Sequence, residues 1–556
     1  MSSDIRRRPE GALLRTYLRA AGIAPESIAK PLIGVVTIST QVFSERPLAR
    51  DLGVSAAKGV ELSGGFAVRW DSSRTPDLMT WGHAEGYSFA WRDQLADLLE
   101  SWSRQEAVDG LVLVGDSAKT LAGMAMAAAR LNIPAIIVTT GSSRWVYRQT
   151  ADGIAGKRAI ADPYDLLSQT LFAKKKTEKG APEPGADLFN ECLLGQDNHS
   201  SHAMDLALEA LGVTLPGMAT AAAQSPRRAD LAEASGKRAV WLVQNAYPFR
   251  RVLTQNAFHN AIRLSAAMGG SVDVAVHLMA LAHEAGVTIN VDLFDRIARE
   301  TPQICHMGGA GEKSSHSLED LERAGGVWAV LNGLKTQVSP TATLSGKGAL
   351  ELAKTNVIRD PQVIAAHRPF AKHSGIGVLY GNIAPKGAMF LLNQVLPLLA
   401  NFKGPAAVFE SEIEAARAIN EGGVKKGSAL IVRGQGPRGG PGLRKLRVLP
   451  ALLLSRGWNK TVPLLTDGRL PDTPAGLFVS SASPEAAVAG PLAVLKNGDM
   501  IEFDTANRRV GVRLTDLELR IRISRWQAPE VKTARRGFLE RYSRQVSEAH
   551  EGAILK

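Results

Sequence analysis

Cysteine is scarce in this chain of 556 residues, which has only Cys192 and Cys305. Two thiols cannot build a disulfide scaffold, so we expect a reducing compartment, the cytoplasm. Long apolar runs are lacking too, since no stretch reaches the ~18 apolar residues that a membrane span needs. The first eight residues, which include Arg6, Arg7 and Arg8, have no apolar signal-peptide core. These absences predict a soluble protein without a membrane partner.

Aromatic residues and concentrated basic charge are also sparse. Aromatics make up 6% of the chain, and the net charge of +12 arises from 66 Lys and Arg against 54 Asp and Glu. The richest basic stretches, residues 6–8, 174–176 and 535–536, are short and not interleaved with aromatics, so we expect no nucleic-acid partner. A basic balance equally attracts small acids to a cleft. Length and 45% hydrophobic content predict more than one domain.

The most informative stretch is residues 115–123, Gly-Asp-Ser-Ala-Lys-Thr-Leu-Ala-Gly. It lies between the apolar run 110–114 and a helix-favouring segment, 124–131, and a second apolar run follows at 135–138. This order predicts a βαβ crossover with a buried parallel sheet. Ligands bind at the carboxyl ends of such strands, where helix-start amides lack partners, so we expect Ser117 and Lys119 at a site. The alternative is that Ser117 caps the helix and Lys119 is solvated.

Lys119-Thr120 and the later sequence Met-Ala-Ala-Ala-Arg-Leu-Asn-Ile-Pro at 126–134 resemble the dihydroxy-acid, sugar-acid and 6-phosphogluconate dehydratases. The resemblance extends from about residue 11 to 554. It implies an α/β fold with a large N-terminal domain holding a parallel sheet, residues 1–375. A C-terminal swivelling β/β/α barrel-like domain with a tail, residues 376–556, would follow. It also implies a small hydroxy or sugar acid as ligand and a homodimer or homotetramer.

The sequence of the C-terminal part independently favours β structure. Short apolar runs alternate there with Gly, Pro and Asp turns, a spacing typical of strands. The expected strands are 407–409, 428–432, 462–466, 476–480, 492–495, 500–503 and 509–513.

Several positions depart from the family pattern. The resemblance places three cluster cysteines at Glu45, Ser117 and Gly195, two metal-binding carboxylates at Ala118 and Gln435, and the proton-abstracting Ser at Pro471. A carboxylate is a poor substitute for thiolate at an iron–sulfur centre. We therefore expect no iron–sulfur cluster and the loss of the ancestral dehydration mechanism. Asp273 also stands where the family usually has Asn.

Other positions keep or add functional groups. Asp77 matches a metal-binding Asp of the family, and the loop glycines Gly439 and Gly440 can bring backbone amides close to an anion. Asp197, His199 and His202 crowd a helix start, where they suit a divalent metal or a general base. The alternative is a helix cap by Asp197 or Ser200 beside two half-exposed histidines.

The predicted roles follow from these positions. We assign Lys119, His199 and His202 as candidate catalytic residues, Ser117, Gly439 and Gly440 as substrate-binding residues, and Asp77 and Asp197 as ligands of one divalent metal, Mg²⁺, Mn²⁺ or Zn²⁺.

Three functional interpretations remain open. The first is a hydro-lyase-like protein for a small hydroxy or sugar acid that works without a cluster. The second is a non-catalytic family member, a pseudoenzyme, that senses a small acid or pairs with an active relative. The third is a true dehydratase whose site residues lie at other positions than those the resemblance matches, with a foreign ligand in the cluster because two cysteines cannot complete a three-cysteine one. Carboxylates or imidazoles converging on Lys119 would favour the first, and a blocked pocket the second.

Overall fold

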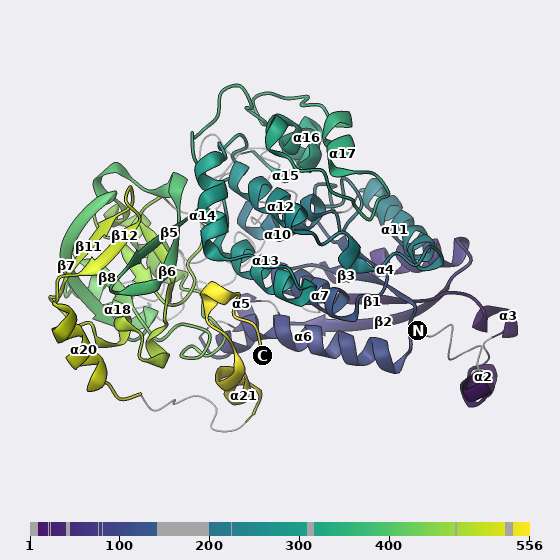
Figure 1. Ribbon diagram of the computed structural model, residues 1–556, viewed down its shortest axis with the longest axis horizontal. Coiled ribbons are helices and arrows are strands. Elements are labelled where there is room, and N and C mark those ends of the chain that lie inside the picture. Colours follow the sequence, from purple (N-terminus) through teal and green to yellow (C-terminus); the bar gives the residue numbers. More distant parts are fainter. Residues whose placement is uncertain are drawn as a thin grey trace, which may run out of the picture.

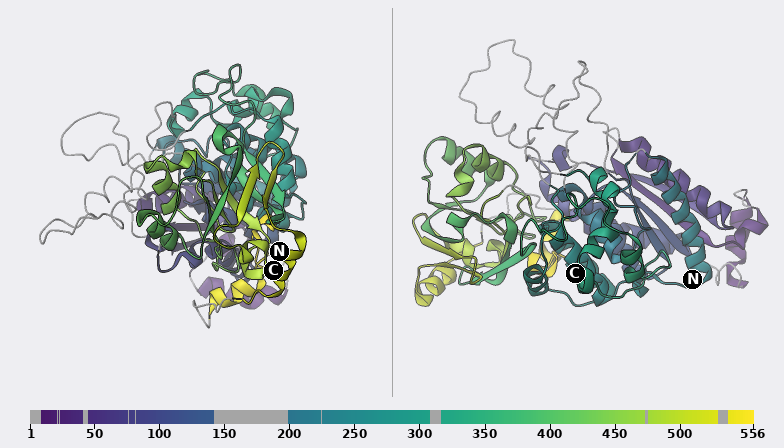
Figure 2. Two further views of the ribbon diagram at one scale, coloured as in Figure 1. Left: turned by 90° about the vertical axis from the view of Figure 1, so that its left-hand side faces the viewer. Right: turned by 90° about the horizontal axis from the view of Figure 1, so that it is seen from above.

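The computed structural model describes residues 9–20, 22, 24–40, 45–75, 77–80, 82–141, 199–223, 225–307, 316–472, 475–528 and 537–556. Two parts are visible side by side in Figure 1 and Figure 2: an α/β half around an open sheet, and a closed barrel. This arrangement confirms the predicted fold class. None of the helices in the described ranges is long and apolar enough to cross a bilayer.

The α/β half contains a parallel sheet with strand order β2-β1-β3-β4. Its strands are β1 Leu32–Thr40, β2 Phe66–Arg74, β3 Gly110–Gly115 and β4 Ala135–Thr139. Every residue of β3 and β4 is buried, as expected when helices cover both faces of a parallel sheet. The predicted crossover is confirmed, since α7, Ala118–Leu131, joins β3 to β4.

Helices cover both faces of this sheet. On one face α4, Glu45–Leu62, packs against α11, Pro226–Gln244. On the other face α6, Glu85–Gln105, packs against α7 (Figure 1). The other helices of this half are α2 Ala12–Ala20, α3 Pro25–Ile28, α5 Asp77–Thr80, α10 His199–Leu211, α12 Gln255–Ala267, α13 Val272–Ala285, α14 Val291–Glu300, α15 Leu318–Ala324, α16 Gly326–Gly333 and α17 Ala349–Thr355.

The second half is a closed barrel with strand order β10-β6-β5-β12-β11-β7-β8-β9. The strands are β5 Ile376–Gly381, β6 Ala384–Leu391, β7 Asn401–Phe409, β8 Ala429–Val432, β9 Leu464–Thr466, β10 Phe478–Ser483, β11 Met500–Asp504 and β12 Arg509–Val512. Its helices are α18 Glu412–Asn420, α19 Val448–Ser455 and α20 Asp516–Ser524.

One predicted strand is wrong. Residues 492–495 do not pair in the sheet, because Pro491 begins a 3₁₀ turn over Pro491–Val494. Proline fixes φ near the helical value at the first position of a turn, so the chain bends there instead of extending. Leu492 is nevertheless fully buried, as an apolar run predicts.

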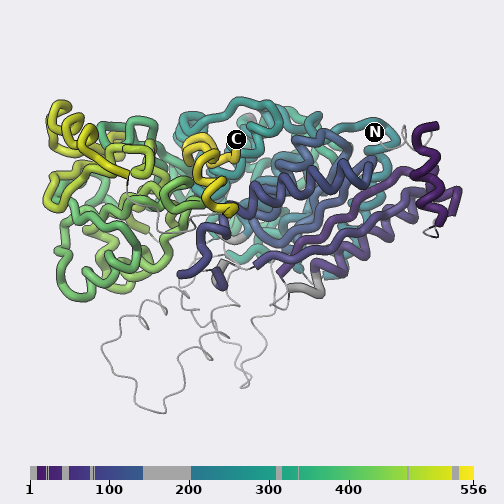
Figure 3. Tube along the Cα trace, turned by 90° about the horizontal axis from the view of Figure 1, so that it is seen from below, coloured from purple at the N-terminus to yellow at the C-terminus, as the bar shows by residue number. Residues whose placement is uncertain are grey.

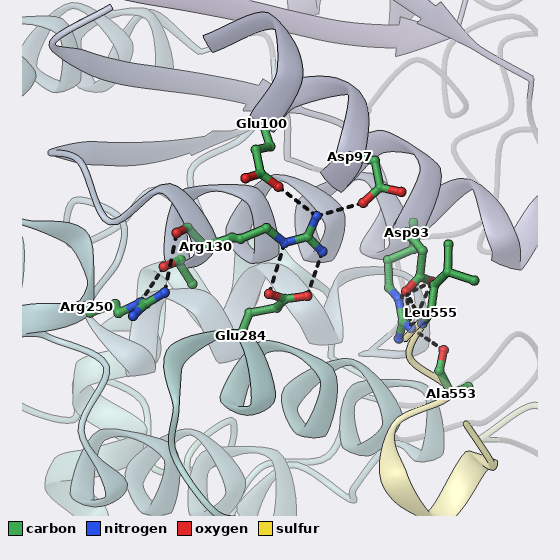
Figure 4. Close-up of polar contacts among 10 residues, drawn as sticks. Asp93, Asp97, Glu100, Arg130, Arg250, Glu284, Ala553 and Leu555 are labelled. Atoms are coloured by element: carbon green, nitrogen blue, oxygen red, sulfur yellow. Dashed lines mark hydrogen bonds and ion pairs between the residues drawn. The ribbon is translucent and has the colours of Figure 1, made fainter. Parts of the chain in front are cut away.

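The chain finally returns to the α/β half. Helix α21, Phe538–Gln545, packs on α6, and Figure 3 shows this last segment at the junction of the two halves. The buried Arg92 donates hydrogen bonds to the carbonyl oxygens of Gly552 at 3.0 Å and Ala553 at 2.6 Å. The Leu555 amide donates to Asp93 at 3.1 Å (Figure 4). These bonds hold the N-terminal part of α6 in place.

The opposite end of α6 is fixed by a second arginine. Arg130 of α7 forms two hydrogen bonds with Glu284 of α13, at 2.7 and 3.0 Å, and contacts Asp97 and Glu100 of α6 (Figure 4). A forked guanidinium that meets carboxylates from two other helices restricts how these helices slide. Helices α6, α7 and α13 therefore form one rigid group.

Candidate functional site

The start of α7 places the residues that the sequence singled out. Ser117 is the N-cap: its Oγ accepts a hydrogen bond from the Thr120 amide at 3.3 Å and donates to Thr120 Oγ1 at 2.9 Å. Ala118 begins the helix and offers no polar group. The capping alternative for Ser117 is thus what the structure shows.

Lys119 is not solvated, so the alternative interpretation of this residue is wrong. Its side chain is buried, with the residue only 7% exposed, and Nζ donates to Ser88 Oγ of α6 at 2.5 Å. Ser88 lies in the first turn of α6 and Lys119 in the first turn of α7. The pair therefore sits where two helices begin, and both helix dipoles direct their positive ends there.

Asp116, directly before the N-cap, ties the strand ends together. Its carboxylate accepts from Arg74 Nε at 2.6 Å and from the Thr40 amide at 3.1 Å. These partners end β2 and β1, so one side chain joins the carboxyl edges of three strands. Asp116 was not predicted as a site residue, although its position directly after an apolar run indicates the carboxyl end of a strand.

An aromatic and cationic cluster lies next to Ser88. The Phe89 ring stacks on His277 of α13 with centroids 5.6 Å apart. The guanidinium groups of Arg92 and Arg469 lie 4.8 and 4.6 Å from the centre of the same ring. Burial and the charge of Arg92 hold the pKa of His277 well below its usual value, and Lys119 adds to the effect. His277 is therefore a neutral imidazole, and neither ring nitrogen has a hydrogen-bond partner among the described residues.

Asp273 connects the two halves of the molecule. Its carboxylate contacts Lys445 Nζ and Arg469 Nη1, each at 2.7 Å, and both cations belong to the barrel half. Burial opposes ionisation, but Arg469 and Lys445 hold the pKa of Asp273 well below its usual value. Asp273 thus forms an ion pair between the two halves.

Asp472 adds a second connection beside this ion pair. Its Oδ1 accepts from the Val272 amide at the start of α13, at 3.0 Å. Burial raises the pKa of Asp472 to about 6. Pro471, where the resemblance places the proton-abstracting Ser, precedes Asp472 and is half-buried.

The glycine loop, residues 436–442, faces the start of α6. A Cβ at Gly442 would lie 2.0 Å from the Gly86 carbonyl oxygen, so only glycine permits this approach. The Gly439 amide donates to Glu485 at 2.9 Å, and the Gly440 amide donates to the Gly436 carbonyl at 2.9 Å. Both predicted anion-binding amides are thus bonded within the chain, and an anion there would displace Glu485.

Burial raises the pKa of Glu485 to about 8, with the nearby Asp467 adding to the effect. Asp467 accepts hydrogen bonds from the amides of Gly434 and Gln435 at 3.0 and 2.8 Å. The Gln435 side chain donates to the carbonyls of Glu410 and Arg433 at 2.9 and 3.0 Å. A carboxylate could not make these two donations, so Gln435 is suited to its position as an amide.

The described residues do not fit the iron–sulfur cluster that the resemblance implies. The Ser117 hydroxyl is used in capping, and Cys305 is buried in the core, where burial raises the pKa of its thiol to about 12. Cluster ligands are thiolates, so this thiol is poorly suited. Within the described ranges no three His, Cys, Asp or Glu side chains converge as metal ligands would.

Five of the predicted site residues lie wholly or partly outside the described part of the structure. Gly195 and Asp197 lie outside the described residues, as do the side chains of Glu45, Asp77 and His199. The backbones of Glu45, Asp77 and His199 begin α4, α5 and α10. His202 is described: its Nδ1 lies 3.5 Å from Asp205 Oδ2.

Comparison with known proteins agrees with this architecture. A family model described as dihydroxy-acid/6-phosphogluconate dehydratase N-terminal matches residues 30–351, and the corresponding C-terminal model matches residues 362–553. The curated dihydroxy-acid dehydratase of Syntrophotalea carbinolica is 38% identical over 98% of this chain and 97% of its own length. That of Geobacter sulfurreducens is 37% identical over 100% of this chain and 99% of its own. Because the matches span both halves, the chain belongs to the dihydroxy-acid/6-phosphogluconate dehydratase family.

Proposed function

We propose that the protein binds the carboxylate of a small hydroxy or sugar acid where α6 and α7 begin, and that it acts as a hydro-lyase without an iron–sulfur cluster. The observation that carries the proposal is the buried Lys119 bonded to Ser88 between two helix starts. Amides at helix starts and a lysine favour an anion. The relatives' name, dihydroxy-acid dehydratase, supports the ligand class.

Lys119 would hold the carboxylate of the acid directly, whereas the resemblance implies that a metal ion holds it. With Ala118 and Gln435 at two ancestral ligand positions, direct contact with Lys119 replaces contact through a metal. Asp77, Asp197 and His199 remain candidate ligands for one divalent metal. The neutral His277 adds no positive charge of its own.

A second candidate function is non-catalytic binding, in which the protein senses a small acid or pairs with an active relative. Two contacts favour it: Glu485 is bonded to the glycine loop, and Asp273 neutralises Lys445 and Arg469. Groups bonded in this way are not available to stabilise charge that develops in a transition state.

The first experiment is analysis of iron, acid-labile sulfide and visible absorption in protein purified without oxygen. We expect a colourless protein. Stoichiometric iron and sulfide would overturn the cluster-free proposal and point to Cys192 and Cys305 as ligands.

The second experiment is calorimetric titration with a 2,3-dihydroxy acid and with a sugar acid, in the presence of a chelator. We expect binding to wild type and a loss of about tenfold or more for Lys119→Met, because one charged hydrogen bond contributes about 1.5–3 kcal/mol. Binding that the chelator abolishes, or that Lys119→Met leaves unchanged, would contradict direct contact with the lysine. Analysis of the products formed from these acids then distinguishes the hydro-lyase function from non-catalytic binding.

A further inference from the structure

We propose that Ser88 is the proton-transferring residue of this site and that Lys119 accepts the proton of its hydroxyl. The substrate in this inference rests on the proposed function, but the reactivity of the pair does not. The distance of 2.5 Å between Lys119 Nζ and Ser88 Oγ allows direct proton transfer. Ser88 is partly exposed, whereas Lys119 is buried, so Ser88 is the more accessible residue of the pair.

The surroundings stabilise negative charge on the Ser88 oxygen. Ser88 is the fourth residue of α6, and Lys119 is the second residue of α7, so both lie at the positive ends of long helices. Electrostatic stabilisation by fixed groups of this kind is a large contribution to catalysis in buried sites.

The structure favours Ser88 over the other hydroxyl at this edge. Ser117 is closer in sequence to Lys119, but its Oγ is engaged by both the amide and the hydroxyl of Thr120. Pro471, at the position of the family's proton-abstracting Ser, has no ionisable group. Ser88 thus supplies a hydroxyl next to a base on the opposite side of the site.

The proton balance of the step is complete. In the form of Lys119 that has lost its proton, the amine accepts the hydroxyl proton of Ser88, and Ser88 Oγ takes the hydrogen at C2 of the acid. The electron pair of that C–H bond forms the C2=C3 double bond as the C3–O bond breaks. The departing hydroxide takes the proton from Lys119 and leaves as water, so both side chains return to their starting states.

The test is labelling of the full-length protein with a fluorophosphonate, which reacts with activated serine oxygens. We expect one adduct per chain on Ser88, located by peptide mass mapping. Lys119→Met should slow the labelling about 100-fold or more, the usual contribution of a general base. Ser411→Ala is the matched control and should label within about twofold of wild type, because Ser411 caps α18 in the barrel half and has no role in the pair.

Lys119→Arg is a second variant, used in case Lys119→Met does not fold. Arginine keeps a donor to Ser88 but stays protonated at neutral pH and does not act as a base, so we expect slow labelling. Absence of a Ser88 adduct in wild type, or labelling of Lys119→Arg at the wild-type rate, would overturn the inference. Near-ultraviolet circular dichroism verifies that each variant is folded.

The two proposals fail in different ways. Lysine-dependent labelling of Ser88 without binding of any hydroxy acid would remove the proposed function and keep the reactive pair. Binding that depends on Lys119 without a Ser88 adduct would do the reverse.

Discussion

The two sides of the interdomain site differ in how their polar groups are used. On the α/β side, the Lys119–Ser88 pair stands at two helix starts. On the barrel side, Glu485, Asp467 and Gln435 each bond to backbone groups of neighbouring loops. These barrel-side groups are thus engaged with the backbone, while the α/β side pairs two side chains with each other. Asp273 joins the two sides by pairing with Lys445 and Arg469.

The largest effect should come from breaking the connection between the sides. Asp273→Asn removes the partner of two poorly exposed cations and should lower the free energy of unfolding by about 4 kcal/mol, measured by urea denaturation. Asp71→Asn is the matched control, because Asp71 pairs with Arg69 at the surface and should cost under about 1 kcal/mol. Equal losses for the two variants would show that Asp273 does not hold the halves together.

The next prediction concerns the pH dependence of the barrel side. Burial raises the pKa of Glu485 to about 8, against 4.5 for an ordinary Glu. The folded protein therefore keeps a proton that the unfolded chain releases, and stability falls as pH rises from 4.5 to about 8. The contribution is about 1 kcal/mol per pH unit within this window.

Glu485→Gln retains an oxygen acceptor for the loop amides but does not titrate. Urea denaturation at several pH values should therefore give a shallower decline for the variant than for wild type. Parallel pH profiles for the two proteins would show that Glu485 is ionised throughout.

A smaller effect should follow from Gln435→Glu, which introduces a carboxylate where the resemblance expects one. Gln435→Glu removes two donated hydrogen bonds and places negative charge against the carbonyls of Glu410 and Arg433. We expect a loss of about 2 kcal/mol at neutral pH and less at acidic pH. The control is Gln362→Glu in an exposed turn, which should change little. Unchanged stability of Gln435→Glu would reveal a pocket on the barrel side that accepts a carboxylate.

The smallest effect is expected for Ser117→Ala, which tests whether the Ser117 hydroxyl contacts the ligand. Ser117→Ala should cost about 1 kcal/mol, the usual value of an N-cap. Ser411→Ala, at the N-cap of α18, should cost the same. Calorimetry of both variants with a hydroxy acid should give wild-type affinity. A specific loss of affinity in Ser117→Ala would mean that this hydroxyl contacts the ligand.

The sequence predicted the elements that have one clear pattern. β3, α7 and β4 were predicted because continuous apolar runs flank a turn-rich stretch. β2 was missed because Phe66–Arg74 is an edge strand with alternating exposure and polar residues. The run 492–495 was assigned wrongly because burial alone does not distinguish a strand from a 3₁₀ turn.

The site was less predictable than the fold. Lys119 was found from its place after a strand, since local sequence defines where a helix begins. Ser88 is 31 positions away, and nothing in the sequence around it indicates that α6 and α7 start side by side. Asp273 was noticed as a change of charge, but its partners Lys445 and Arg469 come from the other half of the chain.

The hydrogen bonds of Arg92 with Gly552 and Ala553 bear on the order in which the molecule assembles. They join positions 460 and 461 residues apart, so they form only after both the α/β core and the returning segment have met. Contacts of such sequence separation are late steps for a chain of this size, since loop closure precedes any gain from them. We therefore expect the first turns of α6, and Ser88 with them, to be among the last parts of the protein to become rigid during folding.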